Sequence, residues 1–238
     1  AAVNVKAGSS FQLDGANVAV NADVNTLAGS GNTWFRANTG NMVVAGTVGN
    51  RANAGSQTQL EARNGTISGA GTIGGHQVIL LGGAVGSVGS RVNTAANQLQ
   101  TEGSNAFIQQ SGGVRVLSTA TNTFDLVAGG TIDVGHVQAA DVKLVAGGAG
   151  SSITSTGGAT IAATAGNVLL NAGKDVSLTG AVSAAGGAVT ANIGMSEGGS
   201  FSTTSSVTSS GGTTINGGAF NDTFNFALPA VNVTVNGG

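Results

Sequence analysis

Asp133, His136 and Asp141 stand close together in the sequence, and their side chains are of the types that carry acid–base or metal chemistry. Such chemistry needs side chains that converge on one point. In a coil of short strands joined by tight corners, neighbouring positions face different sides. The other histidine, His76, lies far away, and no second cluster completes a histidine-based metal site. We therefore expect these residues to be polar residues of a surface or a corner.

A glycine-rich segment, residues 69–74, matches the G-x-G-x-x-G fingerprint of dinucleotide-binding proteins. That fingerprint needs a following helix and an acidic residue about twenty positions later. Here residues 76–81 have the pattern of a strand, and Arg91 occupies the neighbourhood of the expected acid. A chain with 42 glycines produces such a match by chance, so we predict no bound cofactor.

A second segment, residues 217–225, partly fits the calcium-binding nonapeptide G-G-x-G-x-D-x-U-x. Asp222 and Phe224 stand at the expected positions, but Phe220 replaces the third glycine. Calcium in such repeats is shared between consecutive turns, and one degenerate copy supplies too few oxygen ligands. The alternative is a plain corner, with Asn221 and Asp222 capping the turn. The sequence leaves open whether the unit around Asp222 binds calcium in a longer protein.

The scarce aromatic residues are the best candidates for contact with a partner. Trp34 is the one tryptophan, and Phe35 follows it. Aromatic residues favour recognition surfaces, but large rings are also commonly buried, so the alternative is a hydrophobic plug over the N-terminal part of the core. The run Ser202 to Ser210 could form a hydroxyl ladder for a glycan or for ice, or it could be a solvated face.

Charged residues are few and dispersed. The chain has 8 basic and 10 acidic residues among 238, a net charge of −2 and no basic stripe, so nucleic acid is not an expected partner. Carbohydrate-active β-helix enzymes gather acidic or basic groups in one groove. We therefore expect a protein that is not an enzyme, with no catalytic, cofactor-binding or metal residues. No apolar run reaches the roughly 18 residues of a membrane-spanning helix.

Short β-type runs, punctuated by Gly, Asn, Ser or Asp, extend along the whole chain. Many alternate apolar and small polar residues, which is typical of strands with one buried face. The predicted strands are Val3–Val5, Phe11–Leu13, Val18–Val20, Met42–Val44, Val78–Leu80, Val114–Val116, Phe124–Val127, Val142–Val145, Val168–Leu170, Val176–Leu178 and Val231–Val235.

Repeated segments indicate how the strands are arranged. Similar segments begin at Thr214 and Thr234, at Leu126 and Leu144, and at Val168 and Val189. A period near twenty, rich in glycine and β-branched residues, favours a solenoid over a closed globule. We predict an all-β, right-handed parallel β-helix with about three short strands per turn of roughly 18–21 residues. Its narrow core should hold Val, Ile, Leu and Ala.

Three irregular segments are predicted to be loops or bulges: residues 28–38, 49–59 and 197–210. No linker or charge run divides the chain, so we expect residues 1–238 to be a single β-solenoid segment. Because the sequence stops partway into a repeat, we expect it to be a fragment of a longer repeat protein.

Three segments, Gly86 to Val116, Val176 to Thr190 and Asn216 to Phe224, resemble stretches of large bacterial exoproteins of the filamentous-haemagglutinin type. The resemblance covers roughly residues 65–238. It implies a secreted or surface-displayed right-handed β-helix that acts as an adhesin stem or matrix component. The secretion domain of such exoproteins usually carries an Asn-Pro-x-Gly motif, whereas the one proline here is Pro229. A downstream segment is therefore expected.

These observations predict a structural and adhesive segment of a bacterial adhesin, located outside the cell or on its surface, that mediates attachment to surfaces or to other cells. Its expected partners are adjacent repeats of the same polypeptide, glycans or extracellular matrix. The main alternative is a fibre subunit that associates end to end. A carbohydrate-active β-helix enzyme is the less favoured alternative.

Overall fold

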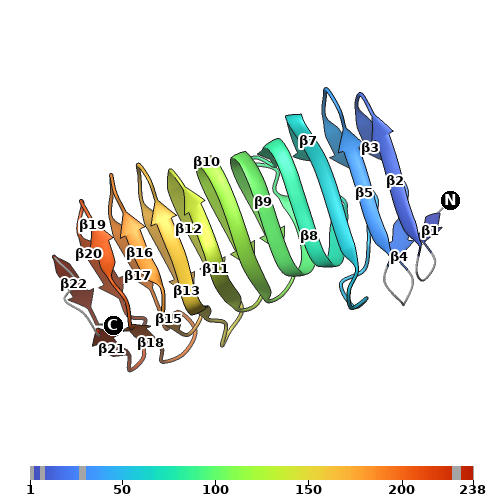
Figure 1. The fold of residues 1–238 in the computed structure, drawn as a ribbon. Helices are drawn as coiled ribbons and strands as arrows, with labels where there is room; N and C mark the ends of the chain where they lie inside the picture. Colours follow the sequence, from blue (N-terminus) through green and yellow to red (C-terminus); the bar gives the residue numbers. More distant parts are fainter. Residues whose placement is uncertain (1–2, 6–8, 27–30, 227–231, 238) are drawn as a thin grey trace. The chain divides into compact units, whose positions relative to one another are not determined.

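The computed structural model describes residues 3–5, 9–26, 31–226 and 232–237. Residue contacts divide the chain into two units, Ala1–Ser111 and Gly112–Gly238. In each unit, short strands pair in parallel with strands one coil later in the chain, so that successive coils stack (Figure 1). The predicted parallel β-solenoid is confirmed, with about 10 turns in the chain.

The described residues of the first unit form nine strands: β1 (Val3–Val5), β2 (Ser10–Gly15), β3 (Val18–Val20), β4 (Val24–Thr26), β5 (Asn32–Ala37), β6 (Met42–Val44), β7 (Gln57–Ser68), β8 (Thr72–Val85) and β9 (Val92–Gln110). The largest parallel sheet has the order β2-β5-β7-β8-β9. A second sheet begins β3-β6-β7, and β1 pairs with β4.

The core of the first unit consists of inward-facing columns with one residue from each coil. Phe35, Leu60 and Leu80 follow one another in register and are fully buried. A second column, on the β3-β6-β7 sheet, runs from Met42 to Ile67, and both are fully buried. The parallel register stacks like residues, because each coil repeats the in–out alternation of the one before it.

In the part of the second unit that the structure describes, there are thirteen strands: β10 (Val114–Ala128), β11 (Ile132–Ala139), β12 (Asp141–Ala146), β13 (Ile153–Ala163), β14 (Val168–Ala172), β15 (Val176–Leu178), β16 (Ala181–Ala184), β17 (Val189–Asn192), β18 (Ser200–Thr203), β19 (Val207–Ser209), β20 (Thr213–Asn216), β21 (Thr223–Phe226) and β22 (Val233–Asn236). They form three parallel ladders, β10-β11-β13-β15-β18-β21, β10-β11-β13-β16-β19 and β10-β12-β14-β17-β20-β22.

All three sequence repeats are register pairs of the second unit. The structure pairs Leu126 with Leu144, Val168 with Val189, and Thr214 with Thr234. The repeats therefore mark equivalent positions of neighbouring coils, as the sequence predicts. Buried aliphatic side chains fill the interior, and Phe124 and Phe201 are also fully buried.

The coils are more variable in length than the predicted 18–21 residues. Lys143 contacts Asp125 across a separation of 18 residues, whereas the corner bond from Asn167 to Asp141 spans 26. The added residues lie in corners and bulges. Between β11 and β13 the register shifts after Val134, where Gly157 and Gly158 adopt φ values of 41° and 77°. Glycine has no Cβ that would make such angles costly.

The predicted strands agree with the structure wherever residues are described; of the last run, residue 231 lies outside the described residues and Val233–Val235 fall in β22. The loop predictions are less accurate. Residues 49–56 are irregular, as predicted, but β5 occupies Asn32–Ala37, and β18 and β19 lie within residues 197–210. Those two predictions are wrong because Thr33 and Phe35, like Thr203 and Val207, face inward and are buried. Residues 28–30 lie outside the described residues.

Among the described residues, no helix is long and apolar enough to cross a membrane.

Candidate functional site

A loop of the first unit, residues 50–55, precedes strand β7 and is hydrogen-bonded to Asn97 on β9. The loop begins after Gly49 (φ 73°) and ends at Gly55 (φ 82°), two angles that favour glycine. Within it, the Asn50 side-chain oxygen accepts the N–H of Ala52 at 2.9 Å, and the Asn50 carbonyl accepts the N–H of Asn53 at 3.2 Å. These local bonds give the loop a defined shape.

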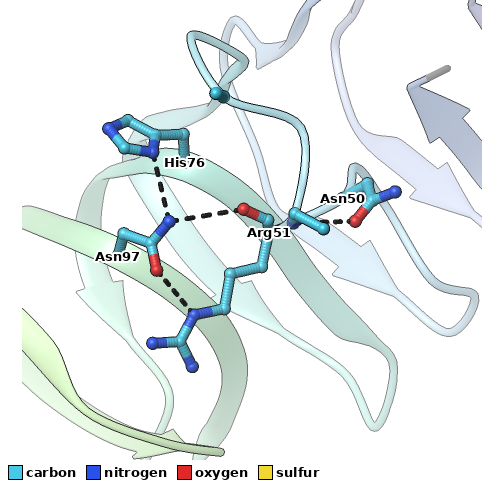
Figure 2. Close-up of a pocket in the computed structure, with 6 residues that line it drawn as sticks. Asn50, Arg51, His76 and Asn97 are labelled. Carbon is cyan, nitrogen blue, oxygen red and sulfur yellow. Dashed lines mark hydrogen bonds between the residues drawn. The ribbon is translucent and has the colours of Figure 1, made fainter. Parts of the chain in front are cut away.

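Asn97 on β9 fastens the loop to the sheet. Arg51 Nε donates to Asn97 Oδ1 at 2.8 Å, and Asn97 Nδ2 donates to the Arg51 carbonyl at 3.3 Å (Figure 2). Asn97 Nδ2 also lies 3.1 Å from His76 Nδ1. The side-chain amide of Asn97 therefore contacts a backbone carbonyl, a guanidinium group and an imidazole.

A cavity of about 450 Å³ lies beneath this loop, lined by Asn50, Arg51, Ala52, Ala54, His76 and Asn97. Its lining combines one cationic side chain, two amides, an imidazole and two methyl groups, and it contains no carboxylate. The volume falls in the range of about 300–1,000 Å³ that is usual for small-molecule sites. This arrangement can bind a small polar ligand.

A second candidate surface is the outward face of the sheet β2-β5-β7-β8-β9. Trp34 on β5 is half-buried and lies in register between Gln12 on β2 and Gln59 on β7. The guanidinium carbon of Arg36 lies 4.8 Å from the centre of the Trp34 ring. Arg36 and Trp34 are two positions apart on one strand, so both side chains leave the same face.

Charged side chains continue this face beside Trp34. Glu61 on β7 pairs with Arg36 at 3.5 Å and with Arg63 at 2.9 Å, and Arg63 reaches Glu102 at 3.6 Å. Ion pairs that are at least partly exposed contribute little to stability, typically ~0–1 kcal/mol each. Their effect here is to hold the Arg36 guanidinium beside the indole.

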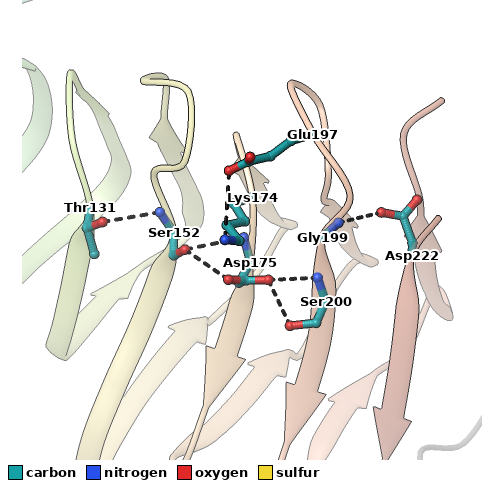
Figure 3. Close-up of polar contacts among 8 residues, drawn as sticks. All are labelled: Thr131, Ser152, Lys174, Asp175, Glu197, Gly199, Ser200 and Asp222. Carbon is teal, nitrogen blue, oxygen red and sulfur yellow. Dashed lines mark hydrogen bonds and ion pairs between the residues drawn. The ribbon is translucent and has the colours of Figure 1, made fainter. Parts of the chain in front are cut away.

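Polar corner residues join the coils of the second unit (Figure 3). The Thr131 hydroxyl accepts the N–H of Ser152 at 3.3 Å, and the Ser152 hydroxyl accepts the N–H of Asp175 at 3.3 Å. Asp175 Oδ1 then accepts both the N–H and the hydroxyl of Ser200 at 2.8 Å. Lys174 and Glu197 form an exposed ion pair beside this corner at 3.8 Å. Each side chain supplies a hydrogen bond that the irregular backbone of the corner lacks.

The side chains of Asp133, His136 and Asp141 do not converge on one point. Asp133 lies 3.8 Å from Arg115, His136 Nδ1 lies 2.5 Å from the hydroxyl of Thr160, and Asp141 Oδ1 accepts the N–H of Asn167 at 2.8 Å. Each residue therefore has a separate structural partner. Within the described ranges, no group of three or more His, Cys, Asp or Glu side chains could hold a metal ion.

In the glycine-rich segment 69–74, residues 69–71 form a corner and residues 72–74 begin strand β8, so the segment leads into a strand rather than into a helix. Gly69 adopts a φ of 122°, and a Cβ there would lie 2.0 Å from the carbonyl oxygen of Val44. A Cβ on Gly71 would lie 2.1 Å from the carbonyl oxygen of Gly46, so the close approach of neighbouring coils requires glycine at both positions. Arg91 Nη1 donates to the carbonyl of Ile108 at 3.2 Å.

Asp222 acts as a corner residue among the described parts of the chain. Its Oδ1 accepts the N–H of Gly199 at 2.8 Å (Figure 3). This bond reaches the preceding coil, 23 residues earlier in the chain, rather than the turn of Asp222 itself.

The remaining sequence candidates divide between core and surface. Phe35 is fully buried and packs against Phe11 at 5.5 Å, whereas Trp34 faces outward, so the plug interpretation holds for Phe35 alone. In the serine-rich segment, the hydroxyls of Ser202 and Ser177 are 3.1 Å apart, and Thr203 is buried. The segment therefore contains one hydroxyl rung between coils.

Sequence reasoning missed the cavity beneath residues 50–55. His76 and Asn97 are 21 residues apart, and Arg51 and Asn97 are 46 apart, so no local motif links them. A signal was present in the irregular segment 49–59, since insertions in one repeat of a solenoid commonly form a binding loop.

Comparisons with protein-family models, with curated proteins and with solved structures each gave no significant match. The resemblance to filamentous-haemagglutinin-type exoproteins therefore stays a prediction.

Proposed function

We propose that this chain is a structural and adhesive segment of a secreted or surface-displayed bacterial adhesin of the filamentous-haemagglutinin type, which mediates attachment to glycans or extracellular matrix. The observation that carries this proposal is the outward pair of Trp34 and Arg36, 4.8 Å apart between ring centre and guanidinium carbon. Trp and Arg are the residue types most enriched among energetically dominant contacts of interfaces.

The surroundings of this pair suit a binding face. Gln12 and Gln59 flank Trp34 in register, and their amides can donate and accept hydrogen bonds with hydroxyl groups. The parallel ladder fixes the spacing of successive side chains at about 4.8 Å. A ligand therefore meets a preorganised surface and loses less entropy on binding than it would against a mobile loop.

The experiment compares beads coated with the wild-type protein and with Trp34→Ala for retention under flow on epithelial glycans and on extracellular matrix. We expect wild-type beads to be retained and the retention to fall several-fold in Trp34→Ala. Phe220→Ala, which removes a half-exposed aromatic residue from the other unit, is the matched control and should leave retention unchanged. No retention of wild-type beads on any surface would contradict the proposal.

A self-associating fibre subunit is the second candidate, and the outermost described coils favour it. Leu13 continues the inward column of Phe35 but is 40% exposed, and Val235 continues that of Ile215 but is 43% exposed. A second copy stacked on either coil would cover such residues and pair its strands. Sedimentation at rising protein concentration tests this candidate, since a constant monomer would exclude it.

A carbohydrate-active enzyme is less favoured, because Asp133, His136 and Asp141 have separate partners. Release of products from acidic polysaccharides by the purified protein would favour the enzyme over the attachment function.

A further inference from the structure

The loop over the cavity makes its coil longer than the coil that follows it. Val48 pairs with Ile73, and Gln57 pairs with Gln77, so these pairs mark the same two positions of neighbouring coils. The two positions are nine residues apart in the coil with the loop (48 to 57) and four apart in the next coil (73 to 77). The extra residues form a loop outside the sheet that lines one side of the cavity, and the stacking of the core residues is unchanged.

This loop is braced at both ends and in its middle. Ser56 is buried, and its hydroxyl donates to the Asn50 carbonyl at 3.2 Å and accepts the N–H of His76 at 3.2 Å. Asn97 holds Arg51 through two hydrogen bonds at 2.8 and 3.3 Å. The cavity is therefore preformed, which lowers the cost of ordering it around a ligand.

The hydrogen bonds of Asn97 fix the orientation of the imidazole. Arg51 Nε can only donate, so the Asn97 oxygen must face it and Asn97 Nδ2 must face His76 Nδ1. His76 Nδ1 is therefore the acceptor, and the neutral ring carries its proton on Nε2. Figure 2 shows Nε2 on the side of the ring away from Asn97.

The chemistry of the lining selects the ligand. Arg51 brings a positive charge, His76 brings an N–H donor, and no carboxylate is present to repel an anion. Asn50 can bond hydroxyl groups, and Ala52 and Ala54 offer apolar contact. Arg and carboxylate groups match in geometry as well as in charge.

We propose that the cavity beneath residues 50–55 binds the carboxylate-bearing ring of an acidic sugar. The inference rests on the proposed attachment function, to which it adds the class of glycan. The cavity adjoins the sheet that carries the Trp34 face: Gln57 and Gln59, bonded to each other at 3.2 Å, lie on β7, and Gln59 is the neighbour of Trp34.

The test is a titration of the ¹⁵N-labelled protein followed by nuclear magnetic resonance. The probes are galacturonate, galactose, which has the same ring without the carboxylate, and acetate, which has the carboxylate without the ring. We expect galacturonate to shift the side-chain amide signals of Asn50 and Asn97. Galactose and acetate should bind at least about tenfold more weakly, because each lacks one group of the recognised pair.

Two substitutions locate the binding. Arg51→Ala should weaken galacturonate binding about 10- to 100-fold, the range expected for a lost hydrogen bond to a charged group. His76→Phe leaves the bonds between Arg51 and Asn97 in place and should weaken binding about 3- to 10-fold. Arg115→Ala removes a surface arginine from the other unit and should bind as the wild type does. Circular dichroism checks that each variant is folded.

Equal binding of galactose and galacturonate, no shift of the Asn50 and Asn97 signals, or an equal loss in Arg115→Ala would each overturn the proposal. Its failure is distinguishable from failure of the attachment function. Retention of wild-type beads without any galacturonate shift overturns the acidic-sugar site alone. Galacturonate binding without retention of beads supports the site and contradicts the attachment function.

Discussion

Asn216 Nδ2 donates to Asn192 Oδ1 at 2.7 Å, although the two residues are 24 positions apart in the chain. The same bond joins Asn192 to Asn171 at 2.6 Å and Asn236 to Asn216 at 2.8 Å. The four amides occupy one register column of β14, β17, β20 and β22. The two interior amides, Asn192 and Asn216, each use one donor and one acceptor along the ladder, so each is bonded to two neighbours.

Asn192→Ala should therefore lower the free energy of unfolding by about 1–3 kcal/mol, because it removes two hydrogen bonds at a partly buried position. Urea unfolding followed by circular dichroism measures the change. Asn225→Ala, on the exposed side of β21, is the matched control and should change the free energy by less than about 0.5 kcal/mol. Equal effects of the two substitutions would mean that the ladder adds no stability.

Two glycines of the second unit should respond differently to alanine. A Cβ on Gly180 would lie 1.6 Å from the carbonyl oxygen of Ala159, whereas a Cβ on Gly147 would meet one atom at 3.6 Å. Gly180→Ala must displace backbone and should cost about 1–3 kcal/mol or more. Gly147→Ala should be neutral or slightly stabilising, since it restricts the unfolded chain. The order of the two melting temperatures checks the prediction, and the reverse order would refute the close approach of the coils at Gly180.

Asn97→Ala should release the loop over the cavity. The substitution removes both bonds to Arg51, each worth about 0.5–1.5 kcal/mol, so the open form should become about tenfold more populated. Trypsin cleavage after Arg51, followed by mass spectrometry, should accelerate accordingly. Cleavage after Arg115 in the same sample is the internal control. An unchanged rate after Arg51 would show that Asn97 does not hold the loop.

Leucine substitutions should separate core from surface in the second unit. Leu144 is fully buried between Leu126 and Leu170, whereas Leu117 is 37% exposed. Leu144→Ala should cost about 2–5 kcal/mol through lost contacts and a cavity, and Leu117→Ala should cost less than about 1.5 kcal/mol. Urea unfolding compares the two, and similar losses would contradict the assignment of the core.

The fold was predictable because the determining signals are local and repeated. Alternation in segments such as Val176–Leu178 identifies strands, and the repeat at Leu126 and Leu144 identifies their register. Coil length was less predictable, because corners accept additional residues, such as Gly157 and Gly158, without disturbing the core. Strand β5 was not predicted, because the adjacent aromatic residues Trp34 and Phe35 interrupt the alternation of apolar and polar residues. In the structure, one ring faces outward and the other inward.

The candidate sites were predictable only in part. Trp34 was identified by its rarity, but its contact with Arg36 depends on their sharing one face of a strand that the sequence did not indicate. The cavity joins Arg51, His76 and Asn97, which come from three coils. Their proximity follows from register, and the register offset changes here because the corner at residues 50–55 is longer than the corresponding corner of the next coil.

The most direct test of the account uses the fluorescence of Trp34, the one tryptophan in the chain. Glycans released from the surface that retains the beads are added to the protein, and the emission and its quenching by acrylamide are recorded. If Trp34 belongs to the attachment face, the bound glycan should shift the emission and reduce quenching. Retention of the beads with no change in either quantity would contradict the claim that attachment occurs through this face.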